Sequence, residues 1–167
     1  MPSVDQWFDE YSESHRHPVN KAFHWVCVPA IVLSVLGILS LLPLPALTAR
    51  WPWANLGTLA AALALLYYVR LSPALALGVL PLLVLCFAGL DALAAQPWPL
   101  WQSCVVIFVV AWIGQFIGHA IEGRRPSFFK DLQYLLIGPL WLLGFIYRGV
   151  GIRYSRADPG PAGTPGQ

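Results

Sequence analysis

Residues 24–42 read HWVCVPAIVLSVLGILSLL and form a long apolar run that ends at the turn Pro43-Leu44-Pro45. A helix that crosses the hydrocarbon layer of a membrane needs about 20 mostly apolar residues. Comparable runs occupy residues 55–71, 74–95 and 100–119, each bounded by proline or polar residues. These four runs predict an all-α integral membrane protein built on a bundle of four transmembrane helices.

The composition excludes the common soluble classes. Of the 167 residues, 57% are apolar and only 11% are charged, whereas a soluble domain carries roughly 25% charged residues. A net charge of +2 is too small to indicate nucleic acid as a partner. The three cysteines, Cys27, Cys86 and Cys104, lie in apolar runs and do not suggest a disulfide scaffold. The lipid bilayer is therefore the expected surroundings of the chain.

Three further segments accompany the four runs. Residues 3–11 combine a capping-box pattern with apolar residues at helical spacing, unlike a cleaved signal peptide, and predict an amphipathic helix on the membrane surface. A fifth apolar stretch, 132–147, is short and interrupted by Gly138-Pro139, so it could be re-entrant, interfacial or spanning. We expect one membrane-embedded domain over residues 1–156 and a disordered Gly/Pro-rich tail over 157–167.

The basic residues predict the orientation of the bundle. If the N-terminus is cytoplasmic and four helices cross, most lysines and arginines lie on the cytoplasmic side and only Arg50 lies outside, as the positive-inside rule requires. Both termini are then cytoplasmic. Arginine greatly outnumbers lysine, and alanine, glycine and proline are frequent. This composition favours a bacterial inner membrane, or the endoplasmic reticulum membrane if the protein is eukaryotic.

Four histidines are candidate metal ligands. His15, His17 and His24 precede or begin the first apolar run, and His119 ends the fourth. The predicted topology brings these sequence-distant positions to the same membrane face. Neutral imidazole is a common metal ligand, and four histidines limit the site to one metal ion. Alternatively, each histidine could be a contact to lipid headgroups, a reading that we favour for His17.

Polar residues around the histidines follow helical spacing. Gln115, His119 and Glu122 stand at i, i+4 and i+7 and so share one helical face. Tyr11 and Asn20 each precede a histidine by one helical turn. Because ionisable groups near a membrane span cost free energy, the stripe predicts a polar site inside the bundle. Glu122 could instead belong to a solvated, charge-balanced loop.

Two segments carry a family resemblance. Residues 7–24, WFDEYSESHRHPVNKAFH, and residues 112–127, WIGQFIGHAIEGRRPS, are followed by Gly138-Pro139. Together they resemble the membrane 2-hydroxy fatty acid dioxygenase family, formerly a domain of unknown function, over about residues 5–150. The family pattern is Y…H…N…H near the N-terminus and QF(I/V)GH…E…P after the last long span. Fungal members depend on Fe(2+) and shorten 2-hydroxy fatty acids by one carbon, with O2 consumed and CO2 released.

The resemblance implies roles for individual residues. The implied iron ligands are His15, His24 and His119, with His17 as an additional candidate. Gln115 and Glu122 are the candidate catalytic residues, although Glu122 follows the last histidine by three residues where some members place the acid four away.

The remaining candidates concern the substrate. A 2-hydroxy acid can chelate iron through its hydroxyl and carboxylate groups, and Lys21, Arg124 or Arg125 could pair with the carboxylate. The alternative to this dioxygenase is a non-enzymatic membrane scaffold or assembly protein with a structural polar cluster. A transporter ranks last, because Asp91 is the only acidic residue within the four runs.

Overall fold

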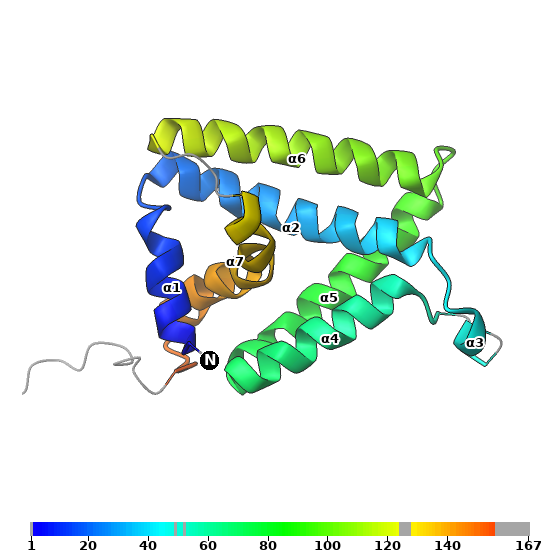
Figure 1. Ribbon diagram of the computed structural model, residues 1–167, viewed down its shortest axis with the longest axis horizontal. Helices are drawn as coiled ribbons and strands as arrows, with labels where there is room; N and C mark the ends of the chain where they lie inside the picture. The colour runs from blue at the N-terminus through cyan, green and yellow to red at the C-terminus, as the bar shows by residue number, and fades with distance from the viewer. Residues whose placement is uncertain (1, 49, 52, 124–127, 156–167) are drawn as a thin grey trace, which may run out of the picture.

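The computed structural model describes residues 2–48, 50–51, 53–123 and 128–155. In these residues the chain is helical and contains no named β-strand (Figure 1). The helices are α1 (Val4–Glu13), α2 (Pro18–Ser40), α3 (Pro45–Thr48), α4 (Leu56–Leu71), α5 (Pro73–Ala94), α6 (Leu100–Glu122) and α7 (Phe128–Gly149). The predicted all-α class is confirmed. The predicted tail over 157–167 lies outside the described residues.

Local sequence explains where the helices begin and end. The Ser3 hydroxyl accepts a hydrogen bond from the Gln6 N–H, and the Gln6 side chain accepts one from the Ser3 N–H, which is the predicted capping box. Asn55 and Thr58 form the same arrangement at the start of α4. α6 ends at Gly123, whose positive φ of 73° favours glycine.

Three helices, α2, α5 and α6, are long and apolar enough to cross a membrane, judged over the described residues. Large apolar side chains point outward on all of them, among them Val26, Val84 and Val110, as expected for surfaces that face lipid. α4 has 16 residues and is apolar but shorter. The four-span count therefore stays a prediction, as does the placement of α7.

Two helices extend beyond the apolar runs that predicted them. α2 begins at Pro18, before the apolar run that starts at His24, because proline is favourable at the first position of a helix. α6 continues past His119 to Glu122. The polar residues at both ends are therefore helical, and this places the candidate ligands on regular structure.

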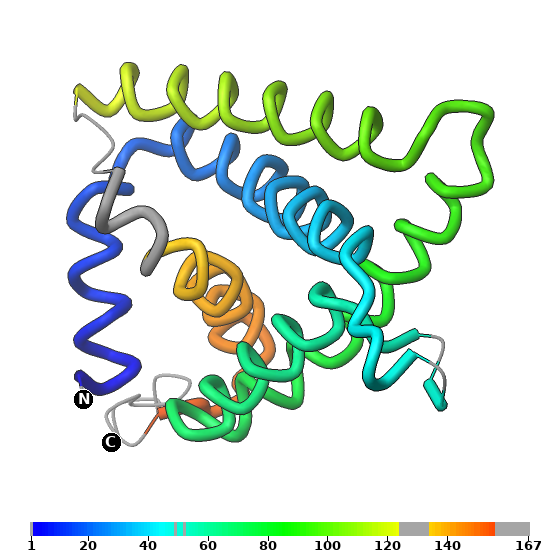
Figure 2. The backbone as a smooth tube through the Cα atoms, turned by 45° about the vertical axis from the view of Figure 1, so that its right-hand side comes forward, coloured from blue at the N-terminus to red at the C-terminus, as the bar shows by residue number. Residues whose placement is uncertain are grey.

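α2 and α6 run antiparallel and side by side in both overall views (Figures 1 and 2). Two glycines of α6 allow the close approach. A Cβ at Gly118 would lie 2.5 Å from Asn20 Oδ1, and a Cβ at Gly114 would lie 2.6 Å from Cys27 Sγ. Small residues at helix crossings commonly bring membrane helices together. The start of α2 is thereby fixed beside the end of α6.

The predicted amphipathic helix is confirmed as α1, but its apolar face is not free to contact lipid. Val4, Trp7, Phe8 and Tyr11 are buried in a cluster with residues of α7. In addition, the Trp141 Nε1–H donates to the Ser12 hydroxyl at 2.9 Å. α1 is therefore part of the protein core, and its C-terminal end leads directly to His15.

Candidate metal centre

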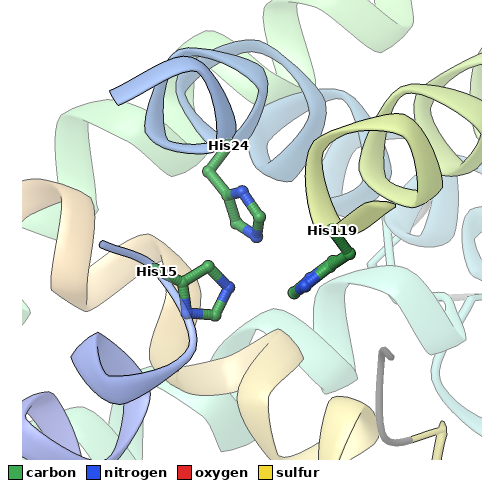
Figure 3. A group of neighbouring side chains, drawn as sticks. All are labelled: His15, His24 and His119. Atoms are coloured by element: carbon green, nitrogen blue, oxygen red, sulfur yellow. The ribbon is translucent and has the colours of Figure 1, made fainter. Parts of the chain in front are cut away.

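Three histidines from distant parts of the chain meet where α2 begins and α6 ends. Figure 3 shows His15, His24 and His119 directed toward a common point. All three are buried, and one nitrogen atom of each lies within 4.8 Å of the others. The structure thus brings together the three histidines that the sequence singled out as iron ligands.

Each histidine is held by a different element. His15 lies in the linker between α1 and α2, and its ring stacks on Tyr11 with centroids 4.0 Å apart and planes 6° apart. His24 lies in the N-terminal part of α2, and His119 lies in the last turn of α6. The antiparallel pairing of α2 and α6 is what brings the second and third rings together.

Backbone carbonyls orient two of the three rings. His15 Nδ1 lies 2.5 Å from the Tyr11 carbonyl oxygen, and His24 Nδ1 lies 2.9 Å from that of Asn20. Because a carbonyl oxygen only accepts, each Nδ1 carries the proton and donates it. The lone pair of each ring is therefore on Nε2, and this arrangement of an oriented imidazole is typical of metal-binding histidines.

The environment also sets the protonation state of the linker histidine. Burial lowers the pKa of His15 to about 4, an effect that the hydrogen bond to the Tyr11 carbonyl partly offsets. His15 is therefore neutral near pH 7, and the neutral ring is the form that binds a metal ion. A buried group of three imidazoles suits Fe(II) or Zn(II) and leaves coordination positions for other ligands.

A small cavity of about 50 Å³ adjoins the histidines. This exceeds the roughly 10–15 Å³ that a single water molecule requires. Two buried polar atoms at this cavity, His119 Nδ1 and Gln115 Oε1, have no hydrogen-bond partner among the described residues. Unpartnered buried polar atoms are costly, so the donor set fits a metal ion and a polar ligand.

Glu122 lies beside this group rather than in it. Its carboxylate accepts hydrogen bonds from the backbone N–H groups of Arg16 at 3.0 Å and His17 at 2.8 Å. It also accepts one from Asn20 Nδ2 at 3.2 Å. The carboxylate therefore joins the end of α6 to the linker that carries His15 and to the start of α2.

The other predicted site residues occupy different places. His17 is the N-cap of α2, where its Nδ1 accepts a hydrogen bond from the Val19 N–H at 3.2 Å. Lys21 is half-buried on α2, with its ammonium group 5.9 Å from the centroid of the Phe145 ring. The predicted substrate contacts Arg124 and Arg125 lie outside the described residues.

Three residues have contacts at the site that the sequence did not assign to them. Tyr11 supplies a ring and a carbonyl to His15, and Asn20 connects His24 with Glu122. The sequence indicates these contacts only through spacing, because Tyr11 precedes His15, and Asn20 precedes His24, by four residues. Tyr134 of α7 also lines the small cavity, and nothing in its apolar segment predicts this position.

The comparisons with known proteins identify the family of the chain. A family model described as 2-hydroxy-palmitic acid dioxygenase Mpo1-like matches residues 1–150. Searches of curated proteins and of solved structures gave no significant match. The matched region includes the three histidines, Gln115 and Glu122, and it confirms the resemblance found in the sequence. The chain therefore belongs to the 2-hydroxy-palmitic acid dioxygenase Mpo1-like family.

Proposed function

We propose that the protein is an Fe(2+)-dependent membrane dioxygenase that shortens 2-hydroxy fatty acids by one carbon. The proposal rests chiefly on the buried group of His15, His24 and His119, two of which are oriented by backbone carbonyls. Together with family membership, this donor set supports an iron centre better than a structural polar cluster. Bound iron would supply the redox chemistry with O2 that amino-acid side chains lack.

The overall reaction balances without another co-substrate. A 2-hydroxy acid and O2 give the acid shorter by one carbon, CO2 and water. The bond between the carboxyl carbon and the hydroxyl-bearing carbon breaks, the substrate loses four electrons, and O2 accepts them. The chain must therefore hold the hydroxyl and carboxyl groups together at the histidines and keep bulk water away from them.

Gln115 is suited to orient the hydroxyl group. Its Oε1 is buried and has no hydrogen-bond partner among the described residues, and it lines the same cavity as the histidines. An amide oxygen accepts a hydrogen bond from a hydroxyl group. We therefore assign Gln115 the role of an acceptor for the 2-hydroxyl group of the substrate.

A basic side chain near the site could pair with the substrate carboxylate in addition to the iron. Lys21 precedes His24 by one turn of α2. Its positive charge is near enough to His15 to help lower the pKa of that histidine. We propose that Lys21 pairs with the substrate carboxylate, with Arg124 or Arg125 as further partners. Glu122 acts indirectly in this scheme, as a positioning residue that holds the linker of His15 against α6.

The location follows from the same proposal. The apolar helices support an integral membrane protein, and the basic residues favour cytoplasmic termini. We place the site at the cytoplasmic face of a bacterial inner membrane, or of the endoplasmic reticulum in a eukaryote. A substrate dissolved in the bilayer would then present its polar end at the interface, where the histidines lie.

Replacement of His119 tests the proposal. His119→Ala is expected to abolish O2-dependent loss of 2-hydroxypalmitate and to reduce iron in the purified protein, while expression and membrane insertion stay unchanged. His17→Ala is the matched control, because His17 caps α2 outside the histidine group. Full turnover by His119→Ala would refute the proposed centre. Absence of iron binding by the unmodified protein would favour the scaffold alternative.

A further inference from the structure

A larger apolar cavity lies next to the histidine site. It has a volume of about 440 Å³ and is lined by residues of α2, α4, α5 and α7, helices that Figure 2 shows around the interior of the molecule. Pockets for small molecules span about 300–1,000 Å³. None of the described residues that line it carries a charged side chain. The cavity therefore suits an alkyl chain and not a charged headgroup.

The two cavities are adjacent. Val28 and Leu135 line both the small cavity at the histidines and the large apolar one. Val28 lies one turn beyond His24 on α2, so the apolar cavity begins about one helical turn from the histidine group. From Val28 the lining follows α2 as far as Leu39, a rise of about 16 Å at 1.5 Å per residue. One leaflet of hydrocarbon is about 15 Å thick, which is the span of one membrane acyl chain.

α4 supplies a wall of small residues along the cavity. Ala60, Ala61 and Ala64 line it on this side. The start of α4 packs against the end of α2, because a Cβ at Gly57 would lie 2.6 Å from the Leu36 carbonyl oxygen. Ala60 is therefore at the end far from the histidines, and Ala64 is one turn nearer to them.

The end of α4 lies closest to α7. The Tyr68 hydroxyl donates to the Leu136 carbonyl at 2.8 Å, and Leu136 is next to the shared wall residue Leu135. The order along α4 toward the metal centre is thus Ala60, Ala64 and Tyr68. Each step of one turn is about 5.4 Å, so α4 offers positions at graded depths in the cavity.

We propose that this cavity binds the acyl chain of the substrate, with its methyl end near Leu39 and Ala60, and that the alanines of α4 set the accepted chain length. The inference rests on the proposed function, which places the hydroxyl and carboxyl groups at the histidines. A bilayer lipid is the competing occupant, since the cavity lies among helices that face the membrane. The shared lining residues Val28 and Leu135 favour the substrate, because they place the acyl cavity directly beside the histidine site.

Phenylalanine substitutions at graded depths test the chain-length role. Ala60→Phe should lower kcat/KM for 2-hydroxypalmitate by about tenfold or more and leave 2-hydroxyoctanoate nearly unaffected. Ala64→Phe fills the cavity nearer the site, so it should also reject 2-hydroxylaurate, which Ala60→Phe still accepts. Ala62→Phe is the matched control, because Ala62 is exposed and does not line the cavity. Identical chain-length profiles in all three variants would overturn the inference.

Photolabelling of the iron-free protein gives a readout that does not depend on turnover or on the folding of a variant. A 2-hydroxypalmitate analogue with a diazirine at its methyl end should label peptides that contain Leu39 and Ala60, and unlabelled 2-hydroxypalmitate should compete. Labelling restricted to outward-facing residues such as Leu63, or equal labelling by a diazirine phospholipid without competition, would overturn the inference. Competed labelling without any turnover by the iron-loaded protein would instead refute the dioxygenase function and retain the acyl site.

Discussion

The Glu122 carboxylate accepts a hydrogen bond from the backbone N–H of His17 at 2.8 Å, across 105 positions of sequence. This contact fixes the linker before α2 against the end of α6. His15 lies in that linker, and His119 lies one turn before Glu122. Glu122 thereby couples the position of His15 to that of His119 through a backbone contact and not through their rings.

Loss of the Glu122 carboxylate should weaken metal binding. Glu122→Ala removes the acceptor of two backbone N–H groups and of Asn20 Nδ2, so the linker is free to move. Residues that orient metal ligands typically contribute about 10–100-fold in affinity, and we expect a loss of that size for Fe(2+). Glu122→Gln keeps one acceptor oxygen, so its affinity for Fe(2+) should lie between that of the native protein and that of Glu122→Ala. An iron titration of the purified protein measures the effect, with exposed Glu13→Ala as the control.

The close approach of α2 and α6 should not tolerate a larger side chain at Gly118. In Gly118→Ala the new methyl group would lie 2.5 Å from the buried Asn20 Oδ1, so Asn20 must shift and weaken its bond to Glu122. Overpacking of this kind costs about 1–3 kcal/mol. Thermal unfolding in detergent should show the destabilisation, together with a lower iron content. In Gly149→Ala the new methyl group meets nothing within 4 Å, and equal behaviour of the two variants would contradict the prediction.

Gln115 should affect substrate recognition and not iron binding. Gln115→Leu removes a buried oxygen that has no partner among the described residues, so the variant should fold at least as well as the native protein. Loss of one hydrogen bond to the substrate costs about 1 kcal/mol, which corresponds to a fall in kcat/KM of about fivefold. Kinetics with 2-hydroxypalmitate and iron analysis on the same preparation separate the two effects. A proportional loss of iron and activity would assign Gln115 to the metal site instead.

Removal of the metal should be reversible. A chelator that strips iron from membranes is expected to abolish turnover, and added Fe(2+) should restore it. His24→Ala should not respond to added Fe(2+), because it lacks one of the three imidazoles. If Zn(2+) alone restored turnover in the chelator-treated native protein, a redox role of the metal would be excluded, since zinc has no redox chemistry.

The sequence was sufficient to predict which histidines meet. If the four apolar runs all cross, as predicted, the start of the first and the end of the fourth share a side, and this pairing of His24 with His119 agrees with the histidine group of the structure. The role of Glu122 could not be predicted in this way. Its helical spacing places it on the face of His119, but its partners are backbone N–H groups of a linker whose conformation no periodicity encodes.

The packing of α1 and the apolar cavity were also beyond the sequence. An amphipathic pattern is the same whether the apolar face of α1 contacts lipid or contacts α7, and the buried Phe8 and Tyr11 show the second arrangement. The cavity requires α2, α4, α5 and α7 to leave space between them. The angles at which the helices cross determine the size of this space. Those angles depend on close contacts such as that between Gly57 and Leu36.

We propose that the histidine site cleaves the bond next to the carboxyl group of a 2-hydroxy fatty acid. The most direct measurement uses iron-loaded membranes and 2-hydroxypalmitate carrying an isotopic label in its carboxyl carbon. We predict that the native protein releases the label as CO2 and forms pentadecanoic acid in equal amount, only when O2 is present. Iron-loaded native protein that consumes no substrate, or that forms pentadecanoic acid with O2 excluded, would contradict the account.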